Sequence, residues 1–135
     1  MTINKDLENY IKRDILPQYE KNDSGHSLEH IDYVLKRCFK FAEQFENIDF
    51  NMLFAIATFH DIAHHIDKKN HEKLSAEIFY NNKKMKDFFS EEEESKIVFS
   101  ENDFIEKKQE GIISNWLVPN AQKNMMEPML IELDK

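Results

Sequence analysis

The stretch from Phe50 to Ala63 reads Phe-Asn-Met-Leu-Phe-Ala-Ile-Ala-Thr-Phe-His-Asp-Ile-Ala, and it decides both the fold class and the position of the site. Its residues are apolar nearly all the way round a helix, which predicts the central buried helix of an all-α protein over about residues 50–65. His60 and Asp61 interrupt the apolar run. A carboxylate in such surroundings is costly to bury unless it is paired or binds a metal ion. The pair therefore predicts a functional site.

Histidines gather in the same half of the chain. All six lie between residues 26 and 71, namely His26, His30, His60, His64, His65 and His71. His30 falls beside the apolar stripe of an amphipathic helix expected over about residues 26–46. The thirty residues from His30 to His60 suffice for two antiparallel helices with a short connection. His64 follows four positions after His60, so a helix would put both on one face with Asp61. We expect His30, His60 and Asp61 to bind one divalent ion, since nitrogen and oxygen ligands favour Mn, Fe, Co, Ni, Mg or Zn over metals that prefer thiolates.

The remaining pattern predicts a single compact domain over residues 1–135, a bundle of about five or six helices. Two glycines and three prolines argue for helices, and 11 phenylalanines with 41% apolar residues supply a core. Further helices are expected over about residues 4–16 and 71–85, with a loop at 21–25. Ser90 is expected to cap the helix that begins with the four glutamates after it.

Composition also limits the partners. The net charge of −8 disfavours long nucleic acids and anionic membranes, although a bound cation could still attract a small phosphate. No apolar run approaches the ~20 residues of a membrane span, and the first residues lack the apolar core of a signal peptide. The single Cys38, expected to be a small buried side chain, fits a reducing compartment. We expect a cytoplasmic protein.

Three segments in order carry a family resemblance. They are Asp23-Ser24-Gly25-His26-Ser27-Leu28-Glu29-His30-Ile31-Asp32-Tyr33-Val34, then Phe59-His60-Asp61-Ile62-Ala63, then Asn70-His71-Glu72-Lys73-Leu74-Ser75-Ala76-Glu77-Ile78. Together they resemble the HD superfamily of metal-dependent phosphohydrolases, over about residues 10–99. The resemblance implies hydrolysis of a small, nucleotide-like phosphate ester, with His30, His60 and Asp61 as metal ligands. It also implies that Asp61 orients water, and that His64, His26 and His71 neutralise charge or move a proton.

The chain departs from the family pattern in two places. Tyr33 stands where many relatives carry Arg, which would alter phosphate contacts. The late family segment that supplies a last Asp ligand is not found, because Asp103 and Asp134 are both poorly placed for it. The divergence of residues 100–135 suggests truncation or a shift in reading frame near residue 102.

Two other functions fit the same residues. The pairs His26/His30 and His60/His64 have i, i+4 spacing, so they could form a closed four-histidine site that binds metal or haem without catalysis. Alternatively, the chain is an inactive relative of the HD enzymes, because the last ligand is absent. His65 is expected at the surface.

Overall fold

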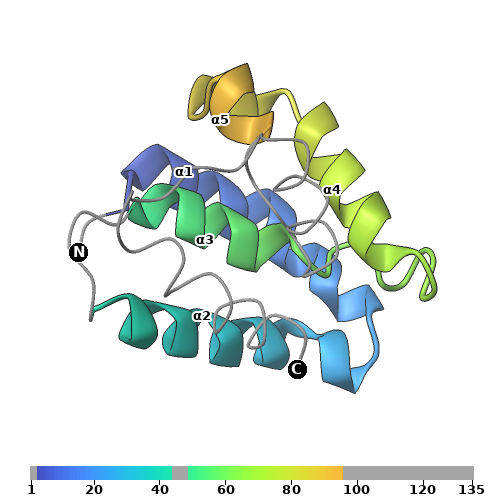
Figure 1. Ribbon diagram of the computed structural model, residues 1–135. Helices are drawn as coiled ribbons and strands as arrows, with labels where there is room; N and C mark the ends of the chain where they lie inside the picture. The colour runs from blue at the N-terminus through green and yellow to red at the C-terminus, as the bar shows by residue number, and fades with distance from the viewer. Residues whose placement is uncertain (1–2, 44–48, 96–135) are drawn as a thin grey trace, which may run out of the picture.

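The computed structural model describes residues 3–43 and 49–95, and it confirms the all-α prediction (Figure 1). Within these residues there is no strand. The described residues form five α-helices together with short 3-10 and π-helical segments. In chain order the elements are α1 (Lys5–Tyr10), a π-helical turn (Ile11–Ile15), two 3-10 segments (Leu16–Lys21 and Ser24–His26), α2 (Leu28–Ala42), α3 (Phe50–Phe59), α4 (His71–Asn81), a 3-10 segment (Lys84–Asp87) and α5 (Glu91–Ser95).

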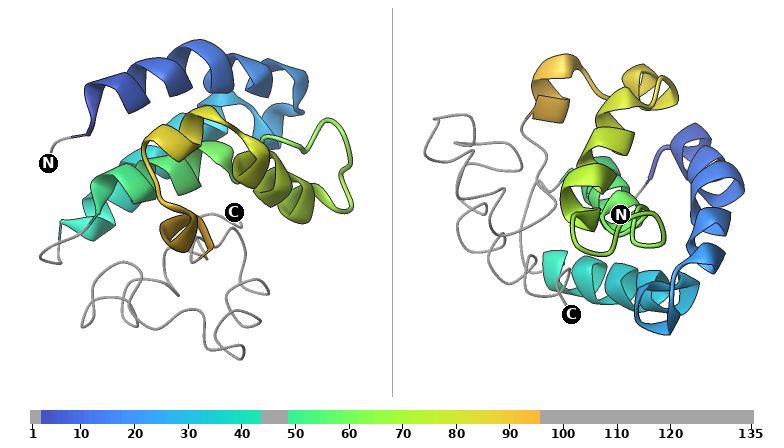
Figure 2. Two further views of the ribbon diagram at one scale, coloured as in Figure 1. Left: turned by 90° about the horizontal axis from the view of Figure 1, so that it is seen from above. Right: turned by 90° about the vertical axis from the view of Figure 1, so that its right-hand side faces the viewer.

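Helix α3 is the centre of the bundle, as its sequence predicts. Every residue from Met52 to Phe59 is buried. Asp49 immediately precedes the helix and caps it, because its carboxylate accepts a hydrogen bond from the Met52 amide at 3.0 Å. The end-on view in Figure 2 shows α3 surrounded by the N-terminal segments, α2 and α4. A helix buried on all sides needs apolar residues on all sides, which explains the continuous apolar run.

The segment from Lys5 to Lys21, here called the N-terminal arm, covers one side of α3. It presents an apolar residue at every fourth position, and all of these side chains are buried: Leu7, Ile11, Ile15 and Tyr19. The sequence predicts a helix over 4–16, whereas the arm stays helical to Lys21 and changes its winding after Tyr10. Pro17 does not break the arm, because it lies at the start of the 3-10 segment, where no backbone N–H donor is required.

Helix α4 packs on another side of α3. The ring of Phe79 meets that of Phe59 edge-on, with centroids 5.1 Å apart. The predicted helix over 71–85 ends earlier, at Asn81. Asn82 leaves the helical conformation, and its side-chain amide donates to the Tyr10 hydroxyl at 2.9 Å.

The chain re-enters a helix at Ser90. Its hydroxyl accepts from the Glu93 amide at 3.1 Å, and the Glu93 carboxylate accepts from the Ser90 amide at 3.1 Å. This reciprocal capping box confirms the predicted helix start. Residues 100–135, which diverge from the family pattern, lie outside the described residues. Across 3–43 and 49–95, no helix is long and apolar enough to cross a membrane.

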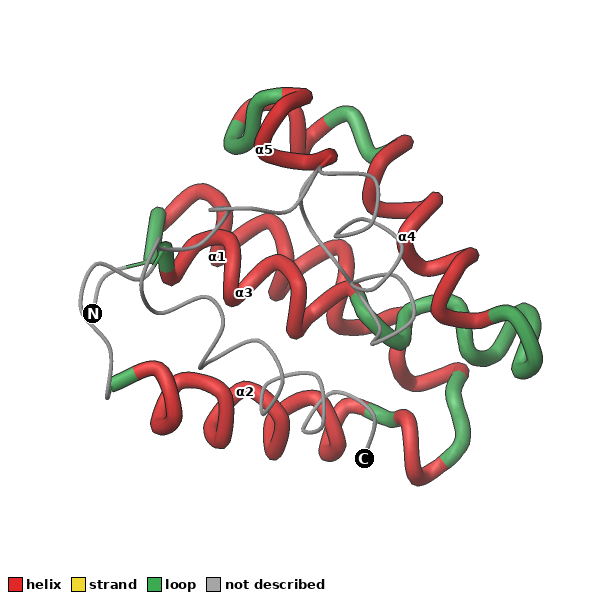
Figure 3. The backbone as a smooth tube through the Cα atoms, in the orientation of Figure 1, coloured by secondary structure: helices red, strands yellow, loops and turns green. Residues whose placement is uncertain are grey.

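The prediction that α3 extends to about residue 65 is wrong. The helix ends at Phe59, and residues 60–66 form successive turns, drawn as a loop between α3 and α4 in Figure 3. Side chains take over the hydrogen bonds that would extend the helix. The Asp61 amide bonds the Tyr19 hydroxyl at 3.3 Å, and the Ala63 amide bonds the Ser75 hydroxyl at 3.0 Å. Because these amides find partners elsewhere, the i to i−4 ladder stops.

Candidate metal centre

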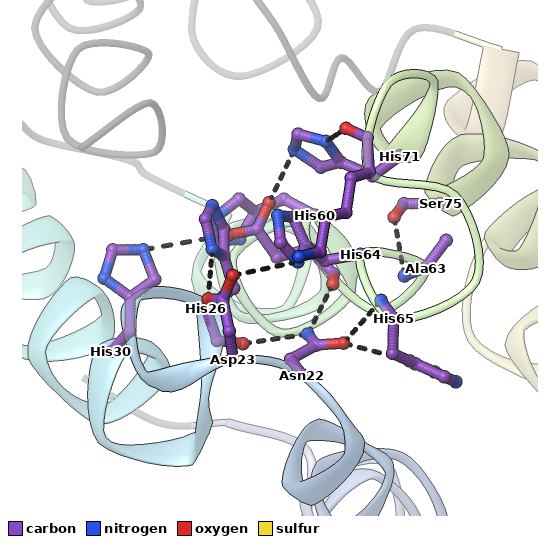
Figure 4. A network of polar contacts seen from close by, with 12 residues as sticks. Asn22, Asp23, His26, His30, His60, Ala63, His64, His65, His71 and Ser75 are labelled. Carbon is purple, nitrogen blue, oxygen red and sulfur yellow. Dashed lines mark hydrogen bonds and ion pairs between the residues drawn. The ribbon is translucent and has the colours of Figure 1, made fainter.

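Three segments distant in the sequence bring five histidines together (Figure 4). His26 comes from the 3-10 segment before α2, and His30 from the first turn of α2. The prediction that one helix face carries His60, Asp61 and His64 is wrong, because all three lie in the turns after α3. His71 is the first residue of α4. The carboxylate of Asp61 is buried among them.

The three metal ligands expected from the sequence lie close together. Nε2 of His60 is 3.3 Å from Oδ2 of Asp61, and Nε2 of His30 is 3.8 Å from the same oxygen. The rings of His30 and His60 have centroids 6.1 Å apart. Ligand atoms that share an ion with bonds of ~2.0–2.2 Å lie about 3 to 4.2 Å from one another. The geometry of His30, His60 and Asp61 therefore suits one shared cation.

Hydrogen bonding fixes which nitrogen of His60 faces Asp61. Nδ1 of His60 lies 2.7 Å from the Ala57 carbonyl oxygen, which can only accept, so Nδ1 carries a proton. Nε2 then points to the carboxylate. Histidines that bind metals commonly donate their other ring N–H in this way. A neutral His60 would direct a lone pair at a carboxylate oxygen, and a cation between the two atoms satisfies both.

Burial disfavours positive charge on the neighbouring imidazole. Desolvation lowers the pKa of His30, and the nearby His60 lowers it further. Nε2 of His30 is buried and has no hydrogen-bond partner among residues 3–43 and 49–95. For Asp61, burial raises the pKa, but the hydrogen bond and charge interaction that His60 makes when its Nε2 is also protonated outweigh burial, so in the metal-free chain the pKa of Asp61 is lowered overall. The group thus combines an ionised carboxylate with a neutral imidazole, which are the protonation states that metal binding requires.

Of the other three site histidines, His26 and His71 are partly exposed, whereas His64 is buried. His71 directs Nε2 at Oδ1 of Asp61 from 3.2 Å, while its Nδ1 donates to the Lys68 carbonyl at 2.9 Å. The rings of His26 and His64 are stacked, with centroids 3.5 Å apart and planes at 12°. Side-chain exposure is 33% for His26 and 19% for His71, against 5% for Asp61, so a ligand would approach from this side.

Asp23 also belongs to this side of the site, although the sequence predicts only a loop over residues 21–25. Its Oδ1 lies 2.8 Å from Nδ1 of His26, and its Oδ2 lies 3.9 Å from Nδ1 of His64. The hydrogen bond with His26 lowers the pKa of Asp23. Burial and the adjacent His26 lower the pKa of His64, whose Nδ1 is buried without a hydrogen-bond partner in the described ranges.

Two side chains that the sequence does not mark as functional hold the turn in place. Tyr19 is fully buried, and its hydroxyl donates to the Thr58 carbonyl at 2.6 Å while accepting from the Asp61 amide. Asn22 donates to the carbonyls of His26 and Asp61, at 2.8 and 2.9 Å. Their only signal in the sequence is a polar group at the edge of an apolar pattern, which does not reveal a partner 39 residues away.

The expectation that His65 lies at the surface is wrong. This histidine is half-buried rather than at the surface, because both its amide and its Nδ1 bond the Asn22 side-chain oxygen, at 2.8 and 2.9 Å. The four histidines of the predicted closed site do not form one ligand group within the described residues. His26 and His64 stack face to face instead of converging on a point. Cys38 is buried, as expected.

Comparison of the chain with protein-family models, with curated proteins and with solved structures finds no match.

Proposed function

We propose that the chain is a metal-dependent phosphohydrolase that acts on a small, nucleotide-like phosphate ester. The observation that carries the proposal is the convergence of His30, His60 and Asp61 within shared-ligand distance around a buried carboxylate. The order of these residues in the sequence, which resembles that of HD phosphohydrolases, supports the choice of reaction. A divalent ion held there would polarise a phosphoryl oxygen and lower the pKa of a water molecule.

The residues of the chain supply the remaining requirements. Asp61 has two oxygens, so one can bind the ion while the other orients water for attack on phosphorus. His26 and His71 are the more exposed histidines of the site, and His64 stacks on His26, so these three rings would meet the negative charge of the substrate directly or through a bound cation. Ile62 and Ala63, the next two residues along the chain, are buried as well, and low polarity around a site strengthens its electrostatic interactions.

Charge supports a cation rather than a bare histidine cluster. The chain carries a net charge of −8, and Asp23 and Asp61 add carboxylates within the site itself. A phosphate ester would be repelled by these groups unless a cation reversed the local sign. The pKa of both His30 and His64 is lowered, so protonation of these rings does not supply that charge near neutral pH.

The test is elemental analysis of the purified full chain beside its Asp61→Asn variant, followed by hydrolysis of a generic phosphoester with added Mn²⁺ or Co²⁺. Asp61→Asn removes the anionic ligand with little change in volume, so metal content and turnover should both fall while helicity by circular dichroism persists. Asp32→Asn is the matched control, because its carboxylate is exposed and pairs only with Lys36 at 2.9 Å among the contacts described. It should retain both properties.

The alternatives give different results. A non-catalytic four-histidine protein that binds metal or haem should tolerate Asp61→Asn and lose its ligand with His64→Ala. An inactive relative should bind metal and show no turnover. A wild-type chain that binds no metal in the presence of excess Mn²⁺ or Co²⁺ would contradict the proposal.

A further inference from the structure

We propose that a groove between the N-terminal arm and α2 binds a small hydrophobic amine, that is, an apolar molecule with one cationic nitrogen at its end. The groove has a volume of about 580 Å³, which lies within the ~300–1,000 Å³ typical of small-molecule sites. None of its lining residues belongs to the candidate ligand groups around Asp61. The proposal therefore does not depend on the proposed function.

Apolar side chains from both walls form the interior of the groove. The arm and α2 run in opposite directions on neighbouring sides of α3 (Figure 1, Figure 2). Ile31 is 1% exposed and forms the floor, whereas Leu28 is 41% exposed. A single exposed leucine is ordinary, but here five apolar residues line one groove, and an apolar ligand would cover them: Leu16, Pro17, Leu28, Ile31 and Leu35.

The charged side chains on the walls are mostly acidic. They are one lysine and three carboxylates, namely Lys12, Glu20, Glu29 and Asp32. Two of these four already have partners within the chain, because Lys12 lies 3.6 Å from Glu8 and Asp32 lies 2.9 Å from Lys36. The charge left over in the groove is therefore negative, which favours a cationic ligand over an anionic one.

Glu20 and Glu29 supply the charge that would hold a cation. Both side chains are exposed, and neither forms an ion pair with any of residues 3–43 and 49–95. Glu20 lies near the end of the arm and Glu29 in the first turn of α2, so both stand where the chain passes from the arm into α2. A cationic nitrogen would lie at this end of the groove. The apolar body would then extend along the two helical turns, about 10 Å, from Leu28 to Leu35.

The size of the groove favours a small molecule over a protein partner. Nine residues line it, whereas a stable protein interface takes about 20–30 residues on each side. A molecule in the groove would contact the arm and α2 together. The arm also carries Tyr19, whose hydroxyl bonds the Asp61 amide in the turn after α3. Binding should therefore favour the docked arm and raise the Tm of the chain.

The experiment compares three probes of similar size and different charge: phenylbutylamine, phenylbutanol and phenylbutanoate. Each is titrated at neutral pH into the isotope-labelled full chain, and the amide signals are followed by nuclear magnetic resonance. We expect saturable binding of the amine, with the largest shifts in residues 12–20 and 28–35, weaker binding of the alcohol, and the weakest binding of the carboxylate. Glu20→Gln and Glu29→Gln should each weaken binding of the amine by up to about fivefold, as for exposed ion pairs, and leave the alcohol unchanged.

Glu77→Gln is the matched control, because Glu77 is an exposed glutamate on α4 that also forms no ion pair among the described residues. It should leave the affinity for all three probes unchanged. Leu28→Ser should weaken binding of all three probes alike, since it removes apolar contact area, and circular dichroism checks that each variant stays folded.

Four results would overturn the proposal. They are equal binding of the three probes, shifts confined to residues outside the groove, no saturable binding of the amine, and a concentration-dependent dimer that Leu28→Ser dissociates. The last result would assign the groove to a second copy of the chain. None of these results depends on metal content or turnover, so the proposed function is tested separately.

Discussion

The Tyr19 hydroxyl offers a direct test of how the turn after α3 is held. Tyr19→Phe removes one oxygen from a fully buried side chain and leaves the ring in place. That oxygen donates to the Thr58 carbonyl at 2.6 Å and accepts from the Asp61 amide at 3.3 Å. Each buried group left without its partner costs about 1–3 kcal/mol, and the longer bond belongs at the lower end. We therefore expect the variant to lose about 3 kcal/mol of unfolding free energy.

Thermal and urea unfolding of the metal-free chain measure this loss. For a domain of this length, about 3 kcal/mol corresponds to a fall in Tm of roughly 10 °C. Tyr33→Phe is the matched control, because Tyr33 is 47% exposed and its hydroxyl bonds only the exposed Arg37, at 2.9 Å, among the bonds described. Its effect should stay within about 0.5 kcal/mol. Equal effects of the two substitutions would refute the reasoning that Tyr19 replaces helical hydrogen bonds.

Three further outcomes are expected. Burial lowers the pKa of His64, so the unfolded chain binds more protons than the folded one below pH ~6.5. The urea midpoint of the metal-free chain should fall between pH 7.5 and 5.5, and less steeply in His64→Gln; an equally steep fall in that variant would contradict this. Ser75→Ala leaves the buried Ala63 amide without its acceptor and should cost about 1–3 kcal/mol in urea unfolding, whereas a loss within about 0.5 kcal/mol would show that the bond is unimportant. Phe79→Ala opens a cavity against Phe59 and should cost about 3–5 kcal/mol, unless the core collapses around it.

The fold class could be predicted because it depends on local spacing. Apolar residues at every fourth position of the N-terminal arm and the continuous apolar run of α3 identify a helix and its burial without knowledge of any partner. The approach of His30 to His60 and Asp61 also follows from sequence spacing, since two adjacent helices bring residues thirty positions apart together. The roles assigned to these residues remain predictions.

The details of the site depend on contacts that spacing does not encode. Helix α3 ends at Phe59 because Tyr19 and Ser75 supply partners to the amides of Asp61 and Ala63. Nothing within residues 50–65 indicates this end, so the sequence predicts a longer helix. The stacking of His26 on His64 is likewise a tertiary contact, because it depends on the position of the 3-10 segment relative to the turn.

The end of α3 has a consequence for how the protein loses its site. The hydrogen bonds that shape residues 60–66 come from positions 39 to 43 residues earlier and from 12 residues later, through Tyr19, Asn22 and Ser75. The ligand geometry therefore exists only while the N-terminal arm and α4 are both docked. If either of them detached, the imidazoles would move apart, while every helix kept its own backbone hydrogen bonds. Far-ultraviolet circular dichroism would then still show the full helicity of the protein, although the geometry of the candidate site had been lost.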